Sequence, residues 1–138
     1  MENRLLTGVL TYGKLAVMSL ALIEDAAKRS SVLWVVLPEG TRLAWHVWHD
    51  DAIYMVVGGG EQNLPGLTAQ HEIEVVLRSK DNGAQLVRFP AAVEVVDQKT
   101  SPEVVAALAK ERLNAPDAAG LPARWARRSS VVRLRPTG

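Results

Sequence analysis

The sequence predicts a mainly β (α+β) fold, in which six short strands form a small antiparallel barrel and helices pack outside it. Six segments have the composition or alternation of strands, turn sequences separate several of them, and only two longer segments have helical composition. The 138 residues are the usual length of one domain, so we expect a single domain over residues 1–138. Hydrophobic residues make up 48% and charged residues 22%, which excludes an intrinsically disordered chain.

The first predicted element is an N-terminal helix over about residues 14–29, which is rich in Ala and Leu. It ends in Lys28-Arg29, where the helix dipole favours cations. The helix is apolar on more than one side, so it should pack against the body of the protein or a second subunit. Its longest apolar run, Leu15–Ile23, has about half the length that spans a bilayer. We therefore expect no membrane association and a cytoplasmic protein.

Three strands are predicted next, as an antiparallel meander. Turn sequences at Pro38-Glu39-Gly40 and Asp50-Asp51 separate three strand-like segments: Val32–Leu37, Arg42–His49 and Ala52–Val57. Alternation places two sets of side chains on opposite faces of the middle strand, Leu43, Trp45 and Val47 on one and Ala44, His46 and Trp48 on the other. We expect the face with His46 and Trp48 to point away from the core.

The second half of the chain contributes two longer strands, a helix and a closing strand. Glu72–Lys80 alternates, with Ile73, Val75 and Leu77 inward, and Asp81-Asn82-Gly83 predicts a hairpin turn into Gln85–Val96. Pro90 predicts a bulge or an edge position in that strand. An outer helix is expected over about 102–114, capped by the Ser101 hydroxyl and followed by a short helical turn at Leu121–Arg128 and a strand at Val131–Arg135.

Several classes of chemistry are absent from the sequence. The chain has no cysteine, which excludes disulfides, thiolate nucleophiles and Cys-ligated metals. His46 and His49 are three residues apart on a predicted strand, so they should face opposite ways and we expect no metal site. Gly58–Gly60 is followed by neither a Lys-Ser nor a Lys-Thr, so it is not a Walker loop, although three glycines let backbone N–H groups approach an anion.

Charge is unevenly distributed, since residues 124–138 carry five arginines and no acidic residue while the net charge is +1. An anion, a partner or the acidic body of the protein itself is a candidate target of this segment. Nucleic-acid binding is unfavourable, because such domains are usually strongly basic and expose stacking aromatic residues.

The predicted face with His46 and Trp48 suits a planar heterocycle or a subunit interface, and the alternative is that a second layer covers Trp48. The order of elements over about residues 14–137 resembles the pyridoxamine 5'-phosphate oxidase-like split barrel, an FMN- or deazaflavin-binding superfamily. The segments that carry this resemblance are Val32–Leu37, Pro38-Glu39-Gly40, 45–51, Ile53–Val57, Asn63-Leu64, the later long strand, the outer helix and 131–137.

This resemblance implies a homodimer with two cofactor sites at the subunit interface and a flavin- or deazaflavin-dependent oxidoreductase, without identifying a catalytic residue. His46 and Trp48 would flank the ring, and the loop residues that would approach the phosphate are Gly58, Gly59, Gln62 and Asn63. The alternative is a non-catalytic split-barrel dimer that binds another small anion or a protein partner and no flavin.

One feature departs from the superfamily. Its members usually have Lys or Arg in that loop, whereas Glu61 is the only charged residue in Gly58–Gly66 here. A carboxylate beside a phosphate is unfavourable. Arg78 and Lys80, or three arginines of the C-terminal segment (Arg124, Arg127 and Arg128), would have to supply the positive charge.

Overall fold

The computed structural model describes residues 20–79, 85–112 and 118–137. Seven strands form one antiparallel sheet: β1 (Val32–Leu37), β2 (Gly40–Trp45), β3 (Val47–His49), β4 (Ala52–Val57), β5 (Glu72–Ser79), β6 (Gln85–Val96) and β7 (Ser130–Pro136). The helices are α2 (Pro102–Glu111) and α3 (Leu121–Arg128), together with an N-terminal helix of which residues 20–29 are described. Short 3₁₀ turns lie at Leu67–Ala69, Gln98–Thr100 and Ala118–Gly120.

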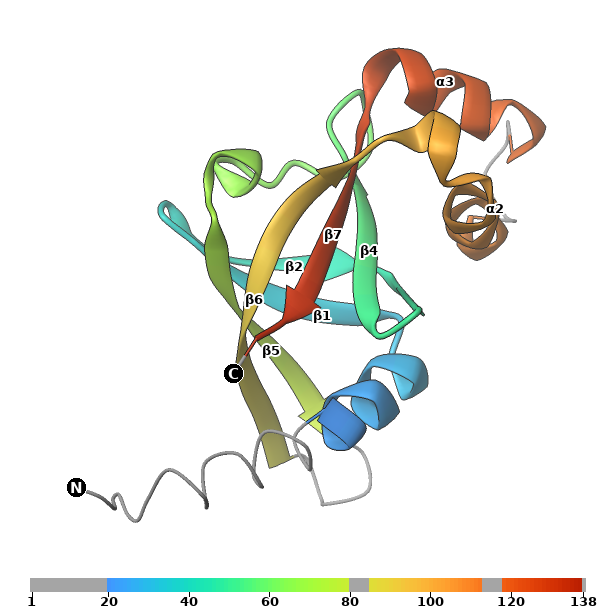
Figure 1. The fold of residues 1–138 in the computed structure, drawn as a ribbon. Helices are drawn as coiled ribbons and strands as arrows, with labels where there is room; N and C mark the ends of the chain where they lie inside the picture. The colour runs from blue at the N-terminus through green and yellow to red at the C-terminus, as the bar shows by residue number, and fades with distance from the viewer. Residues whose placement is uncertain (1–19, 80–84, 113–117, 138) are drawn as a thin grey trace.

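The sheet curls into a half-open barrel (Figure 1). Its strand order is β2-β1-β5-β6-β7-β4-β3, so the two edge strands, β2 and β3, are neighbours in the sequence. Only His46 separates them, and it carries the chain from one edge of the sheet to the other. The mainly β, antiparallel split-barrel class predicted from the sequence is therefore confirmed.

The predicted number of strands, six, is wrong, because the segment Arg42–His49 is two strands. The backbone N–H of His46 donates to the Ser31 carbonyl at 3.1 Å, in the register of the β1–β2 ladder, whereas the next residue, Val47, pairs with Tyr54 of β4. The chain therefore changes its partner strand at His46. The alternating sequence alone gives no sign of this break, since His46 fits the pattern of the strand on both sides.

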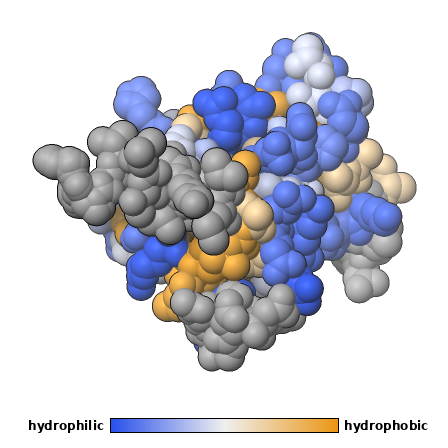
Figure 2. All heavy atoms as spheres, turned by 60° about the horizontal axis from the view of Figure 1, so that its bottom comes forward, coloured by the Kyte–Doolittle hydropathy of each residue, from blue (hydrophilic) through white to orange (hydrophobic). Residues whose placement is uncertain are grey.

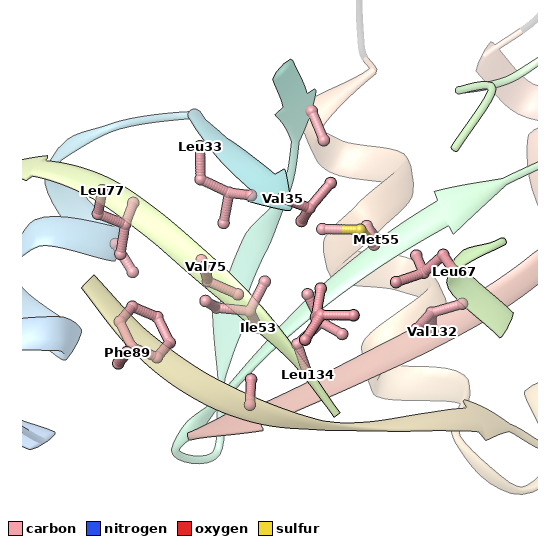
Figure 3. Packing of buried hydrophobic residues seen from close by; sticks show 14 of the residues in the cluster. Leu33, Val35, Ile53, Met55, Leu67, Val75, Leu77, Phe89, Val132 and Leu134 are labelled. Carbon is pink, nitrogen blue, oxygen red and sulfur yellow. The ribbon is translucent and has the colours of Figure 1, made fainter. Parts of the chain in front are cut away.

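The interior of the barrel holds the larger hydrophobic cluster. Side chains from β1, β4, β5, β6 and β7 converge there (Figure 3), among them Leu33, Val35, Ile53, Met55, Val75, Leu77, Phe89, Val132 and Leu134. Ile73, Val75 and Leu77 are buried while Glu74 and Arg78 are exposed, as the alternation of β5 predicts. Lys80 and the predicted Asp81-Asn82-Gly83 turn lie outside the described residues.

A second hydrophobic cluster lies on the outer face of the sheet, where α2 and α3 cover it. Tyr54 and Val56 of β4 pack there against Leu108 of α2 and the fully buried Trp125 of α3. Trp45 and Val47, at the edges of the barrel, pack against the same cluster. The two clusters fix both sides of β4, whose six residues are all buried.

The predicted turns explain the hairpins. Asp50 and Asp51 both have positive φ (49° and 61°) and join β3 to β4 through the His49–Ala52 pair, as in a two-residue hairpin turn. Pro90 lies where β6 leaves β7, because the N–H of Thr137 donates to the Pro90 carbonyl just beyond the end of β7. β6 is nevertheless an interior strand, and its pairing with β5 runs unbroken through Pro90, so the predicted bulge or edge position is wrong.

The described parts of the helices lie where the sequence predicts them, but one predicted capping interaction is absent. α2 begins with Pro102, and α3 spans Leu121–Arg128 as predicted. The predicted Ser101 cap is wrong in its chemistry, because the Ser101 side chain makes no capping hydrogen bond. Residues 14–19 and 113–114 of the predicted helices lie outside the described part of the chain. Within that part, no helix has the length and apolar character needed to cross a membrane.

Candidate functional site

A hollow of about 620 Å³ lies between the N-terminal helix, β3 and α2. Figure 1 shows both helices on the same side of the barrel. The lining residues come from three segments that are far apart in the sequence: Ala27–Ser31, His46–Trp48 and Ala107 with Lys110-Glu111. The hollow therefore brings together the two predicted ring-binding residues, His46 and Trp48. Its volume lies in the range of about 300–1,000 Å³ that small-molecule sites occupy.

His46 is the buried polar residue of this hollow, with 2% of its surface exposed. Its Nε2 lies 3.0 Å from the carbonyl oxygen of Ala27 in the N-terminal helix. Burial lowers the pKa of His46 below the ordinary value of 6.5, although the hydrogen bond to Ala27 acts in the opposite direction. The imidazole is therefore neutral at neutral pH, and it ties the helix to the edge of the barrel.

Trp48 is half-buried in β3, where it packs against the cluster inside the barrel and also lines the hollow. The expectation that its face points away from the core is wrong, because Ala44 and His46 on the same face are each 2% exposed. The opposite face holds Leu43, which is 57% exposed. Trp45 and Val47 lie on the outer face of the sheet, where they pack against the second hydrophobic cluster under α2.

Three cations line the hollow among the described residues, and none of them was predicted to belong to the site. Lys28 and Arg29 come from the N-terminal helix and Lys110 from α2, and among the described residues Glu111 is the one acidic residue that lines the hollow. Lys28 pairs with Glu24 at 2.7 Å and Arg29 with Asp25 at 2.9 Å, both one helical turn away and well exposed. Such surface pairs contribute little to stability, typically about 1 kcal/mol or less. The Lys28-Arg29 pair was noted as a helix end, and only the tertiary packing places it beside Lys110.

The glycine-rich loop has different contacts. The N–H of Gly58 donates to the Gln62 carbonyl at 2.9 Å, and the Gly58 carbonyl accepts from the Ser129 hydroxyl at 2.9 Å. Gly59 has a φ of +62°, and a Cβ there would lie 2.4 Å from the carbonyl oxygen of Arg128. These glycines therefore allow the backbone after α3 to pack closely against the loop.

The side chain of Gln62 links β2 and β4, which are not paired with each other in the sheet. Its amide nitrogen donates to the carbonyls of Trp45 and Val56, at 3.0 and 3.2 Å, and its Oε1 accepts from the Trp45 N–H at 2.6 Å. Both N–H donors of this side chain are thus used, which leaves none for a phosphate oxygen. The amide joins the end of β2 to β4 where the sheet itself is not continuous.

Glu61 is the buried anion of the loop, with 1% of its side chain exposed. Its carboxylate oxygens lie 2.5 Å from Nη1 of Arg112 at the end of α2 and 3.1 Å from Nη2 of Arg124 in α3. The Arg112 guanidinium also lies over the Trp45 ring, 5.5 Å from its centre. Glu61 therefore fastens both helices to the loop, and Arg124 contributes its charge to this carboxylate.

The other predicted site residues lie elsewhere. Arg78 lines a separate hollow of about 290 Å³ on the outer face of β1, β5 and β6, together with Trp34, Leu86 and Arg88. Asn63 is exposed in the loop, and Arg127 and Arg128 are exposed at the end of α3. The structure thus separates the predicted set into His46 and Trp48 in one hollow, the loop residues against α3, and Arg78 on the outer sheet.

The comparisons with known proteins identify a fold. No family model and no curated protein matches the sequence. Among solved structures, HutZ, the heme storage protein from Vibrio cholerae, is similar with a TM-score of 0.60 and 16% identity, over 84% of this chain and 88% of that one. A conserved hypothetical protein from Mycobacterium tuberculosis has a TM-score of 0.61 and 17% identity, over 86% and 80%. An F420 reductase has a TM-score of 0.53 and 20% identity, over 86% and 92%.

The protein is therefore a split-barrel protein with helices packed outside an antiparallel sheet. More particularly, its fold is that of the pyridoxamine 5'-phosphate oxidase-like superfamily, as the resemblance in the sequence indicated. The similar structures include a reductase and a heme storage protein, so the fold alone does not specify a reaction.

Proposed function

We propose that this protein binds a flavin or a deazaflavin in the hollow between the N-terminal helix, β3 and α2, and that it acts as an oxidoreductase. The observation that carries the proposal is the composition of the hollow, which combines the indole of Trp48, the buried imidazole of His46 and three cations. Aromatic and polar groups beside positive charge suit a planar ring that carries a phosphate.

The residues of the hollow fit such a cofactor better than the glycine-rich loop does. Lys110 has no ion-pair partner within the described residues, so it is available to neutralise a phosphate together with Lys28 and Arg29. In the loop, a phosphate would lie beside the buried carboxylate of Glu61. The two nearby arginines, Arg112 and Arg124, already form ion pairs with this carboxylate. We therefore assign the phosphate to the hollow, in place of the loop that the resemblance implied.

A bound flavin or deazaflavin would supply the hydride transfer. The chain's own residues would bind and orient it: Trp48 by contact with the ring, and Lys110 by charge. His46 stays neutral, so it adds no charge beside the ring.

A homodimer is the second part of the proposal, and the outer face of β1 and β2 supports it. Trp34 pairs with Leu43 and with Val76 across the sheet, so the three side chains share this face. Val32, Leu43 and Leu86 are 38%, 57% and 47% exposed. Figure 2 also shows apolar surface gathered at the end of the molecule where β5 and β6 approach the N-terminal helix. Contiguous exposed apolar surface of this kind is typical of an interface.

Sedimentation at micromolar concentration tests the dimer. We expect a species of twice 15.0 kDa for the wild type and a single-chain species for Leu43→Glu, because a carboxylate would be buried without a partner. Val95→Glu, at an exposed position at the opposite end of β6 from Leu86, is the matched control and should leave the dimer intact. A wild type that sediments as a single chain contradicts this part of the proposal.

Titration with FMN and with a deazaflavin tests the cofactor, with tryptophan fluorescence and visible absorbance as readouts. We expect saturable binding, weakened about fivefold by Trp48→Phe because less aromatic surface contacts the ring. Trp34→Phe, on the outer sheet, is the control and should bind as the wild type does. Hemin is the comparison ligand, since one similar structure is a heme storage protein. Binding of hemin alone, or of none of the three, would contradict the proposal.

A further inference from the structure

The second hollow, of about 290 Å³, lies on the outer face of the sheet and is called the outer hollow below. Four strands, β1, β2, β5 and β6, contribute its lining residues: Trp34, Val36, Thr41, Val76, Arg78, Leu86 and Arg88. None of them lines the hollow beside β3. Its volume is just below the range of about 300–1,000 Å³ that drug-sized ligands need, so it suits a molecule smaller than a flavin.

The register of the strands brings an aromatic ring, an aliphatic side chain and two guanidinium groups onto one face. Trp34 lies opposite Val76, and Val76 lies opposite Arg88, so these three residues form a row across β1, β5 and β6. Arg78 is two residues beyond Val76 on β5 and therefore lies on the same side of the sheet. Arg78 and Arg88 are thus diagonal neighbours, which in antiparallel strands lie about 7–8 Å apart. Two long side chains at this spacing can reach one anion placed between them.

Both guanidinium groups have N–H donors to offer to such an anion. Arg78 is exposed and forms no ion pair within the described part of the chain. Arg88 directs one nitrogen, Nη1, to Glu74 at 3.5 Å, and a guanidinium carries five N–H donors. Among the described residues, no acidic side chain lines the outer hollow.

We infer that the outer hollow is a second binding site, for a small aromatic carboxylate. The carboxylate would accept hydrogen bonds from Arg78 and Arg88, because the guanidinium fork matches the two oxygens of a carboxylate. The flat ring would lie against Trp34 and Val76, where an aromatic pair and aliphatic contact stabilise it. This inference is independent of the proposed flavin site, since the two hollows share no residue.

The outer hollow also lies on the face that we propose as the dimer interface, because Trp34, Val76 and Leu86 belong to both. A partner chain on this face would take Arg78 and Arg88 out of water, and a buried charge without a counterion is destabilising. A carboxylate between them would supply the counterion, so the ligand and the partner should favour each other. We expect saturating 2-naphthoate to lower the dimer dissociation constant in sedimentation, and a dimer that dissociates on addition of 2-naphthoate would contradict this link.

A titration followed by ¹H–¹⁵N NMR tests the site with two probes, 2-naphthoate and 2-naphthamide, which share a ring system and differ in charge. For the wild type we expect 2-naphthoate to bind saturably, and 2-naphthamide about tenfold more weakly. The indole N–H signal of Trp34, assigned through Trp34→Phe, should shift, whereas that of Trp48 in the other hollow should not. Equal affinities of the two probes, no saturable binding, or a shift confined to Trp48 would each overturn the inference.

Substitutions of Arg78 test how the carboxylate is held. Arg78→Gln should bind 2-naphthoate about tenfold more weakly and 2-naphthamide as the wild type does. Arg78→Lys keeps the charge without the fork, so its affinity should lie between those of Arg78→Gln and the wild type. Arg135→Gln removes an equal charge at an exposed position of β7 outside the outer hollow, and should bind as the wild type does. Wild-type affinity in Arg78→Gln contradicts the inference.

Competition with FMN separates this inference from the proposed function. We expect saturating FMN, and the variant Lys110→Gln, to leave the affinity for 2-naphthoate unchanged, because both act at the hollow beside β3. Displacement of 2-naphthoate by FMN would overturn the inference, since one site would then hold both molecules. If 2-naphthoate binds and FMN does not, the proposed function fails and the outer hollow is supported.

Discussion

The glycine-rich loop and the hollow beside β3 differ in how completely their polar groups are paired. In the loop, the Glu61 carboxylate, both N–H groups of the Gln62 amide and the Gly58 carbonyl all have partners within the chain. In the hollow, Nδ1 of the buried His46 has none among the described residues, and Lys110 stands without an ion pair. The resemblance found in the sequence implied that both regions bind parts of the same flavin or deazaflavin.

This difference separates the part of the protein that holds the fold together from the part that is prepared for a ligand. A group whose hydrogen bonds are complete stabilises the folded state and gains little from a ligand. A buried group that lacks a partner is destabilising until something pairs with it. On this argument the loop is a structural anchor for α2 and α3, and the hollow is the binding site.

Removal of the buried carboxylate of the loop is expected to have the largest effect on stability, so it tests the difference between the two regions most strongly. Glu61→Gln should lower the free energy of unfolding by about 3 kcal/mol, because Arg112 and Arg124 would keep their charges without the anion between them. Urea denaturation followed by far-UV circular dichroism measures this change. The matched control is Glu74→Gln, whose carboxylate forms an exposed pair with Arg88 at 3.5 Å and should matter by less than about 1 kcal/mol. Equal effects of the two substitutions would show that Glu61 is not an anchor.

A second substitution tests the close packing of the loop. Gly59→Ala should be destabilising by about 2 kcal/mol or more, since its Cβ would meet the Arg128 carbonyl and its φ is positive. Gly60→Ala has a similar backbone strain, with φ of +92°, but no atom within 4 Å of the new Cβ. It should be destabilising by about 1 kcal/mol. Thermal unfolding of the two variants ranks them, and a Gly60→Ala protein less stable than Gly59→Ala contradicts the packing described here.

A smaller effect is expected from the pH dependence of stability. Burial lowers the pKa of His46, so the unfolded chain takes up this proton more readily than the folded one. The stabilising contribution of the neutral ring is therefore present above pH 6.5 and decreases as the pH falls from there toward the lowered pKa. Denaturation of the wild type and His46→Gln between pH 5 and pH 8 should show stability falling more for the wild type. Parallel curves would mean that His46 is not buried in its neutral form.

The sequence predicted most of the fold because the relevant signals are local. Alternation defined the buried residues of β5, the Asp50-Asp51 turn defined a hairpin, and Pro102 marked the start of α2. The break at His46 was not predictable in this way, since it is a change of partner from β1 to β4, and those two strands come close to the same segment only when the sheet curls.

Only the part of the candidate site that depends on local sequence was predictable. Alternation placed His46 and Trp48 on one face of a predicted strand, and both of them line the hollow. Lys28, Arg29 and Lys110 were not assigned to the site, because they are ordinary helix residues until the tertiary structure brings two helices to one hollow. The sequence indicated only that the Glu61 carboxylate is unfavourable beside a phosphate. Its role as an anchor was not predictable, because its partners Arg112 and Arg124 lie about 50 and 60 residues later in the chain.

Titration of FMN against three single variants, followed by tryptophan fluorescence, tests most directly whether the hollow or the loop binds the ligand. Lys110→Gln removes a charge from the hollow, Asn63→Ala removes an exposed loop side chain, and Lys99→Gln removes an equal charge outside both. The account predicts about tenfold weaker binding for Lys110→Gln and wild-type affinity for the other two. Weaker binding by Asn63→Ala together with wild-type affinity for Lys110→Gln would contradict it.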